Sequence, residues 1–238
     1  MRNVLVIFER EFIAYFNGAL AYIIIPVFLL MVGAFSLYFR DVFDLEIVTM
    51  RPIYFWCSLS FLLLIPALTM RAFAEELRTG SYEMLSSLPI SPEQMVLGKY
   101  LAALALMTIA LALTLTYPYT LSQVGDLDIG PVLGGYLGLF MLGAAFCAIG
   151  VAASASTQSQ VIAFVIALLV GLVPFALGYA LSAAPGSLLP LLQHLSFDYH
   201  FSQMAKGIID TRQLIYYGSV IALFLHFAVF QLRRRRLK

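Results

Sequence analysis

The chain has 238 residues, of which 62% are hydrophobic and 11% are charged, and its net charge is +1. Soluble domains carry about a quarter charged residues, so this composition excludes an ordinary soluble domain, and the many large apolar residues exclude a disordered chain. The two cysteines, Cys57 and Cys147, each lie within an apolar run, which excludes a disulfide-rich secreted scaffold. No basic domain points to nucleic acid. The remaining class is an integral membrane protein.

The first expected element is an amphipathic helix over residues 1–17. Phe8 and Phe12 share one arc of this helix, whereas Glu9 and Arg10 lie off that arc. A helix of this kind lies in the inner membrane interface before the chain enters the bilayer. The alternative is a plain extension of the first span.

Apolar runs without charged residues predict six membrane-spanning helices, because one span needs about 20 apolar residues. One long run is divided in two by the polar segment Ser154–Gln160. The expected spans are residues 19–38, 52–72, 95–121, 131–153, 160–182 and 213–232. We therefore expect an all-α integral membrane protein with a single transmembrane domain over residues 1–238.

Basic residues near span ends predict the orientation, because they are enriched in cytoplasmic loops. With the N-terminus inside, ten of the 14 Lys and Arg residues lie on the cytoplasmic side. The other four, Arg40, Arg51, Lys206 and Arg212, lie outside. Both termini are therefore expected in the cytoplasm of a multi-pass protein of the inner (cytoplasmic) cell membrane. We interpret the run Arg233–Arg236 as an anchor in the anionic leaflet and not as a ligand site.

The charged loop between the second and third spans is expected to form a short cytoplasmic helix over residues 80–89. Gly80 can end the helix that descends from the second span, and Ser81 can cap the new one. Pro89 ends it, and Ser91–Gln94 has the pattern of a capping box that starts the third span.

The short helix is expected to have one apolar side, which we assign to Tyr82, Met84, Leu85 and Leu88, with Glu83 on the other side. An apolar side that points to the cytosol is expected to have nothing in its own chain to pack on. This pattern predicts a docking element for a soluble partner.

The outer stretch over residues 183–211 is expected to be helical and to precede the last span. Phe197, Phe201, Met204 and Ile208 recur at helical spacing as a narrow apolar stripe. We expect this stripe to lie along the outer membrane surface or to dip into it.

Small residues are dense in the fourth and fifth spans, where they allow helices to approach closely, within the chain or across a dimer axis. The residues expected at such contacts are Gly134 and Gly138, followed by Ala144 and Ala148, and the pair Gly171 and Gly178.

Catalytic and nucleotide-binding patterns are missing from the sequence. Gly98-Lys99 is the nearest match to a phosphate-binding loop, but it lacks the upstream glycine and the following Ser or Thr. No nucleophile–base pair or paired carboxylates stand within a span. His194 and His200 do not share a helix face, so we expect no metal site. The chain is therefore expected to have no catalytic residues and no cofactor of its own.

The loop sequence EELRTGSYEMLSSLP, followed by GK, resembles the segment after the second span in ABC transporter permeases of the type-2 (export) class. The residues that match are Glu75, Glu76, Gly80, Glu83, Leu85, Pro89, Gly98 and Lys99. Ser81 departs from the Thr that is common there. The N-terminal stretch EREFIAYFNGALAYIIIPVFLL and the late stretch FDYHFSQMAKGIIDTRQLIYYGS most resemble the gliding-motility-type permeases.

The resemblance implies a function and partners. Two permease chains pair as a homodimer, and each binds one of two ABC ATPase subunits, which hold ATP and Mg. The short helix after the second span is the coupling helix that enters a cleft of the ATPase. The implied docking residues are Glu75, Glu76, Arg78, Gly80, Ser81, Glu83, Met84, Leu85 and Leu88. The gliding-motility type often works with a membrane-anchored auxiliary protein that has a large extracytoplasmic domain.

Spans without charges fit an amphipathic or lipid-like cargo among the membrane lipids, or mechanical work on an extracytoplasmic partner. Two other functions stay open: a stand-alone channel or facilitator, and a membrane scaffold that holds an auxiliary protein. The sequence does not name the cargo.

Overall fold

The computed structural model describes residues 2–38, 49–86, 90–123, 125, 127–180, 189–208 and 210–236. Within these residues all regular structure is helical. The helices, in chain order, are α1 (Arg2–Asn17), α2 (Leu20–Tyr38), α3 (Arg51–Thr69), α4 (Ala74–Thr79), α5 (Ser81–Ser86), α6 (Pro92–Leu113), α7 (Thr116–Ser122), α8 (Ile129–Ser156), α9 (Gln160–Ala180), α10 (Leu189–Leu195), α11 (Phe197–Met204) and α12 (Thr211–Arg236).

Five helical segments of the described chain are long and apolar enough to cross a membrane. They are Arg51–Thr79, Pro92–Ser122, Ile129–Ser156, Gln160–Gly178 and Thr211–Arg235. α1 and α2 together make a sixth candidate, but the axis bends by 72° between them. α1 is therefore not a straight extension of α2, as expected for a helix that lies across the entrance of the first span.

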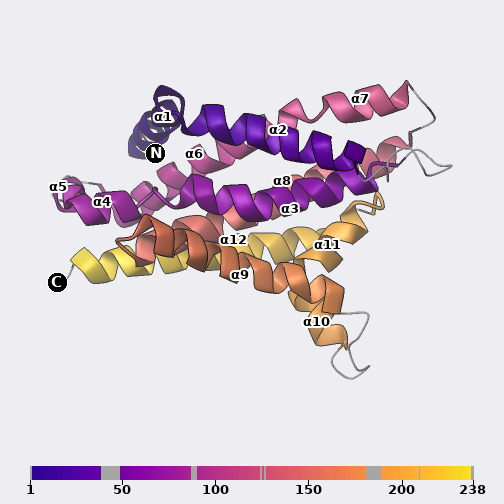
Figure 1. The fold of residues 1–238 in the computed structure, drawn as a ribbon. Coiled ribbons are helices and arrows are strands. Elements are labelled where there is room, and N and C mark those ends of the chain that lie inside the picture. The colour runs from indigo at the N-terminus through magenta and orange to yellow at the C-terminus, as the bar shows by residue number, and fades with distance from the viewer. Residues whose placement is uncertain are drawn as a thin grey trace.

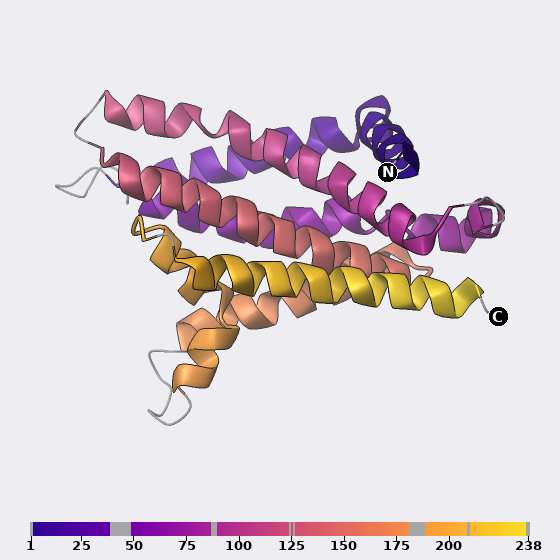
Figure 2. The same ribbon diagram turned by 180° about the vertical axis from the view of Figure 1, so that it is seen from behind.

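The long helices run side by side along one axis (Figure 1). The two chain termini lie at one end of this bundle, together with α4 and α5, and we call this the termini end. The view from behind shows the same arrangement (Figure 2). α7, α10 and α11 lie toward the opposite end. α1 runs across the bundle axis at the termini end.

α8 forms the centre of the bundle. It packs on α3, α6, α9, α11 and α12, and most of its residues from Gly134 onward are buried. Small residues make this possible: a Cβ at Gly143 would lie 2.8 Å from the Met107 side chain, and a Cβ at Gly150 would collide with the Thr69 side chain. Close packing of this kind stabilises helix pairs in a membrane through van der Waals contact.

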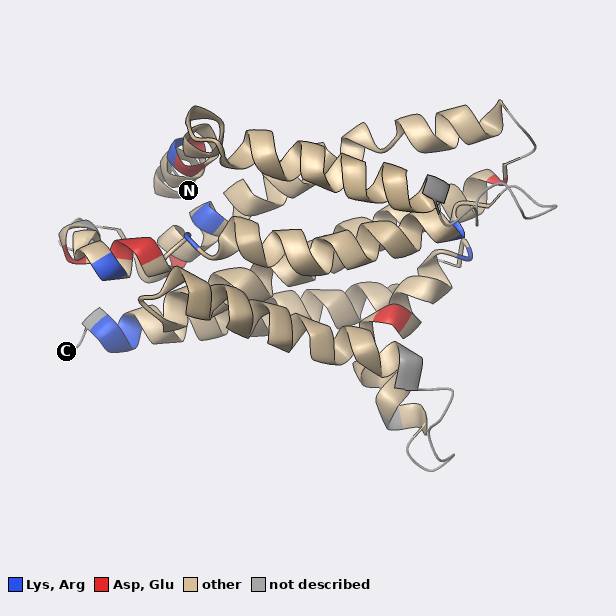
Figure 3. Cartoon of the chain, in the orientation of Figure 1, with Lys and Arg blue, Asp and Glu red and all other residues tan. Residues whose placement is uncertain are grey.

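Charged residues are confined to the two ends of the bundle, and the middle of the described helices carries none (Figure 3). The termini end holds the larger share, from α1, α4 and the last turns of α12. This distribution leaves an apolar zone between two charged zones, which is the pattern that a bilayer requires.

α11 corrects one expectation from the sequence. Phe197, Phe201 and Met204 are 2%, 6% and 0% exposed, because α11 packs on α8 and α9. Ile208, which lies beyond the helix, is exposed. The apolar stripe of α11 is therefore covered by protein and not by the membrane surface. An amphipathic pattern shows that a face is buried, but it does not show whether lipid or protein covers it.

Candidate functional site

α4 and α5 form a short helical hairpin at the tip of the termini end (Figure 1). Gly80 joins them with a left-handed backbone, at a φ of +74°. A Cβ at Gly80 would have no neighbour within 4 Å, so the backbone conformation and not the space favours glycine here. The prediction that Gly80 ends the descending helix is confirmed, and so is the capping box that starts α6 at Ser91.

Ser154 of α8 fixes the break between α3 and α4. Its Oγ accepts the backbone N–H groups of Phe73 and Ala74, at 2.9 and 3.0 Å, and donates to the carbonyl of Met70 at 2.9 Å. The first N–H groups of any helix lack partners within that helix, so Ser154 caps α4 from a different span. This role has no local signal in the sequence, where Ser154 is recognisable only as part of a polar gap between spans.

A cluster of four charged residues lies behind the hairpin and joins three helices. The Lys99 Nζ of α6 lies 2.8 Å from Glu76 Oε1 of α4 and 3.1 Å from Glu11 Oε1 of α1. Arg10 donates to the same two oxygens, at 2.7 Å from Glu11 and 3.4 Å from Glu76. The Lys99 Nζ also lies 5.0 Å from the centroid of the Phe73 ring, within cation–π range. We refer to Arg10, Glu11, Glu76 and Lys99 as the ion cluster.

Three members of the ion cluster are largely withdrawn from solvent, whereas Arg10 is exposed. The Lys99 side chain is only 3% exposed, and those of Glu11 and Glu76 are 18% and 17% exposed. Burial raises the pKa of the Glu11 carboxyl, but the Lys99 ammonium and the Arg10 guanidinium lower it by more, and the net pKa lies below its usual value. A buried charge keeps its ionised form only with such partners, so the three helices are held together electrostatically.

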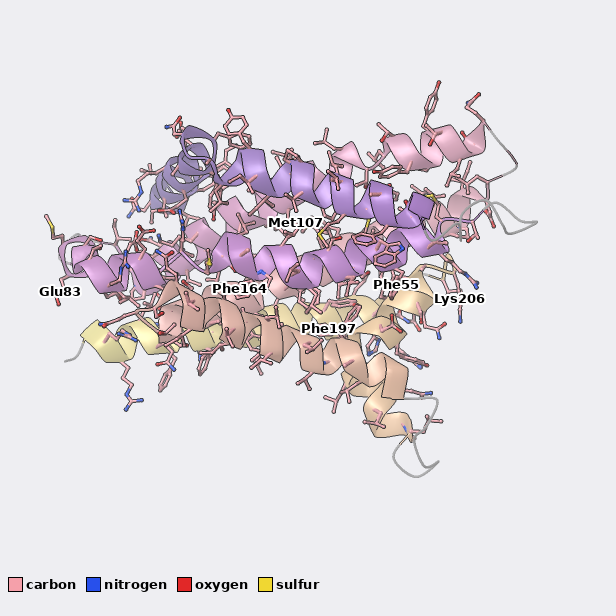
Figure 4. The ribbon with its side chains drawn as sticks, viewed as in Figure 1. Phe55, Glu83, Met107, Phe164, Phe197 and Lys206 are labelled. Atoms are coloured by element: carbon pink, nitrogen blue, oxygen red, sulfur yellow. The ribbon has the colours of Figure 1, made fainter. Side chains whose placement is uncertain are left out.

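The residues expected at a docking surface differ in exposure. Arg78, Gly80, Glu83 and Met84 are exposed, and Met84 reaches 76%. Figure 4 shows Glu83 at the tip of the termini end and Lys206 far away at the opposite end. Glu75 and Ser81 are half-buried, whereas Glu76 points inward to the ion cluster. The side chain of Leu85, and Leu88 altogether, lie outside the described residues.

Tyr82 corrects the expected apolar side of the short helix. It is 5% exposed, and its hydroxyl donates to the carbonyl of Leu232 on α12 at 3.4 Å. Tyr82 and Met84 therefore face opposite ways, since two residues along a helix correspond to a turn of about 200°. Ser81 is the first residue of α5, and its hydroxyl donates back to the carbonyl of Glu76 at 3.5 Å. Tyr82 thus attaches the hairpin to α12, and the Ser81 hydroxyl closes the turn between α4 and α5.

The last turns of α12 hold the neighbouring helices at the termini end. Arg233 pairs with Glu93 in the first turn of α6. The Arg235 guanidinium donates to the carbonyl of Ser156, at the end of α8, at 3.0 Å. The basic run therefore makes contacts within the chain in addition to any contact with lipid.

The glycines of α8 and α9 lie against α3, α6 and α11 within the same chain, and α9 also places a glycine against α8. A Cβ at Gly134 would collide with the carbonyl of Met204, and a Cβ at Gly138 would lie 3.0 Å from the Phe201 ring. A Cβ at Gly178 would lie 2.5 Å from the Asp198 side chain. Ala144 and Ala148 are buried along α8.

The histidines at the opposite end form no metal site in the part of the chain that the structure describes. His200 stacks on Tyr216 with 4.0 Å between ring centroids, and its Nε2 lies 3.3 Å from the His194 carbonyl. Burial lowers the pKa of the His200 imidazole, and burial raises the pKa of the Asp198 carboxyl. His200 therefore packs α11 against α12, whereas Asp198 lies against Gly178 of α9.

A comparison with protein families decides the membership of the chain. The sequence model described as ABC-2 family transporter protein matches residues 47–232, from before α3 into the last turns of α12. The chain belongs to the ABC-2 transporter family. A comparison with curated proteins finds no match. The matched range includes the α4–α5 hairpin, Ser154 and Lys99, whereas α1 and α2 precede it.

Membership in the ABC-2 family fixes the general role. The chain is a multi-pass membrane permease component of an ABC transporter. ABC-2 permease domains are the non-catalytic transmembrane subunits, and they work with an ABC ATPase subunit.

Proposed function

We propose that the α4–α5 hairpin is the coupling element on which the ABC ATPase subunit docks. Its position supports this proposal, because the hairpin is the tip of the bundle at the termini end, where Glu83 lies (Figure 4). Arg78 and Met84 of the hairpin are exposed as well. An exposed thioether between charged groups is typical of an adaptable protein contact. Gly80 shapes the turn, and Ser81 ties it to α4. Glu75, Leu85 and Leu88 complete the proposed docking set.

Glu76 has a different part in this proposal. Its carboxylate is held by Lys99 and Arg10, so it transmits a displacement of α4 to α6 and α1 instead of touching the partner. Ser154 links the same segment to α8 at the centre of the bundle. A displacement of α5 by the ATPase would therefore be transmitted to α1 and α6 through the ion pairs of Glu76, and to α8 through the hydrogen bonds of Ser154.

The wider assembly that we propose is a homodimer of permeases with two ATPase subunits, which bind ATP and Mg. The termini end would face the cytoplasm, at the inner membrane of the cell. The late stretch around α11 supports a gliding-motility type with an extracytoplasmic auxiliary protein. A bundle whose described middle carries no charge supports work on an amphipathic or lipid-like cargo, or mechanical work on the auxiliary protein.

Co-purification of the permease with its ATPase subunit tests the docking proposal. Glu83→Arg combined with Met84→Asp reverses one charge and adds another at the proposed contact, so we expect at least about a tenfold loss of captured ATPase. Glu9→Arg is the matched control, because Glu9 is an exposed acid on α1 and belongs neither to the hairpin nor to the ion cluster. Capture of the double variant at the wild-type level contradicts the proposal.

A further inference from the structure

A cavity of about 500 Å³ opens where α1, α2, α3 and α4 meet. Leu20, Ile23 and Ile24, in the first turns of α2, form its apolar wall, together with Ala67 near the end of α3. Its volume lies in the range of about 300–1,000 Å³ that is typical of small-molecule sites. The cavity therefore has the size of a ligand site. Its apolar side lies at the start of α2 and near the end of α3.

The other side of the cavity is charged. Glu11, Glu76 and Lys99 line it, but these groups already bind one another in the ion cluster. Arg71 and Glu75 line it too, and neither forms an ion pair with any residue that the structure describes. The cavity thus offers one guanidinium and one carboxylate beside an apolar wall.

This combination selects a ligand by charge. A guanidinium binds a phosphate strongly, and a carboxylate binds an ammonium that can donate N–H bonds. A ligand with only a negative charge would leave the half-buried Glu75 without a partner, which is costly. The apolar wall continues from this charged pair along α2, in the direction that an acyl chain takes from the water boundary into the bilayer.

We propose that the cavity binds a phospholipid whose head group carries a primary ammonium, with its phosphate on Arg71, its ammonium on Glu75 and an acyl chain along Leu20, Ile23 and Ile24. A quaternary choline head group has no N–H to donate to Glu75. It is recognised best by cages of aromatic rings, whereas Tyr15 is the one aromatic residue among the described residues that line this cavity. The site depends on the cavity alone and not on ATPase docking.

Native mass spectrometry of the delipidated full-length chain in detergent tests the site. Palmitoyl-oleoyl phosphatidylethanolamine, phosphatidylcholine and phosphatidylglycerol are titrated separately. We expect the ethanolamine lipid to bind at least about tenfold more tightly than the other two, the difference that one charge-assisted hydrogen bond makes. Glu75→Gln and Arg71→Gln should each lower binding of the ethanolamine lipid by about the same factor. Glu9→Gln and Arg234→Gln, exposed residues outside the cavity, should not.

Ala14→Phe gives a test that leaves every charge in place. Ala14 is exposed and lines the cavity from α1, so a phenyl ring there fills the space of the lipid without disturbing the core. We expect it to abolish the preference for the ethanolamine lipid while circular dichroism stays that of the wild type. Equal binding of the three lipids, a preference for the glycerol lipid, or unchanged binding in Ala14→Phe and Glu75→Gln would each overturn the proposal. Arg71→Gln and Ala14→Phe lie outside the proposed docking set, so these two variants should capture the ATPase at the wild-type level, which separates a failure of the lipid site from a failure of docking.

Discussion

Replacement of Lys99 by methionine removes the buried cation that joins α1, α4 and α6. The methylene groups of Lys99 are nearly matched by those of methionine, so the packing around Phe73 changes little. The charge balance changes instead. After the substitution, the Glu11 carboxylate still has the Arg10 guanidinium at 2.7 Å. The Glu76 carboxylate is left with only the longer contact to the Arg10 guanidinium, at 3.4 Å. Glu76 Oε2 is buried and has no hydrogen-bond partner among the described residues.

The cost follows from the buried charge that is left behind. Removal of one partner of a fully buried ion pair costs about 3–5 kcal/mol. Glu76 lines the cavity beside α1 and is 17% exposed, so water reaches it in part, and we expect about 2–3 kcal/mol for Lys99→Met. In a chain of this size that loss lowers the midpoint of thermal unfolding by roughly 4–12 °C.

Thermal unfolding of the purified permease in detergent measures this effect. Lys206→Met is the matched control, because Lys206 is exposed at the opposite end of the bundle, and it should shift the midpoint by less than about 2 °C. Addition of Glu76→Gln to Lys99→Met should recover part of the loss, since the second change removes the stranded charge. The reasoning is refuted if Lys99→Met behaves like Lys206→Met, or if the two cluster substitutions are additive.

The remaining predictions concern other contacts. Ser154→Ala leaves the N–H groups at the start of α4 unpaired, so it should lower the free energy of unfolding by about 2–3 kcal/mol in the same unfolding assay. Ser156→Ala is the control, because it loses only a hydrogen bond to its own helix and should change that free energy by less than about 1 kcal/mol. The pKa of His200 is lowered by burial, so its stabilising effect is present above the ordinary value near 6.5 and is lost as the pH falls below it. The unfolding midpoint of the wild type should therefore drop between about pH 7.5 and 5.5, by more than that of His200→Phe. An equal drop of the midpoint in the wild type and in His200→Phe would contradict this prediction. Asp198 cannot cause such a drop, because the raised pKa of its carboxyl makes the folded state more stable as the pH falls.

Local sequence signals predicted local structure well. Gly80 has the left-handed conformation that was expected of a helix-ending glycine, and Ser91 forms the capping box with Gln94. Runs without charge predicted an all-helical membrane protein, because the bilayer imposes length and polarity on every span. Each of these signals acts within a few residues of the chain.

Contacts between distant residues could not be predicted in the same way. Ser154 caps a helix that begins 80 residues earlier, and Lys99 binds a carboxylate 88 residues away. Neither pairing leaves a periodic trace in the sequence. For the same reason the stripe of Phe197 could be identified as apolar but not as buried against α8 and α9. A lysine within the first turns of an apolar span, with acids in the neighbouring interfacial helix and loop, is the signal that could have suggested the ion cluster.

The central claim is that the force of the ATPase enters the permease through α5, and a cross-linking experiment tests it most directly. Cys57 and Cys147 are buried, so a cysteine introduced at Met84 or at Lys206 is the accessible thiol in each variant among the described residues. We predict that a short thiol–amine cross-linker joins the Met84→Cys permease to its ATPase subunit, and that Lys206→Cys gives no such product. A cross-link from Lys206→Cys together with none from Met84→Cys would contradict the account.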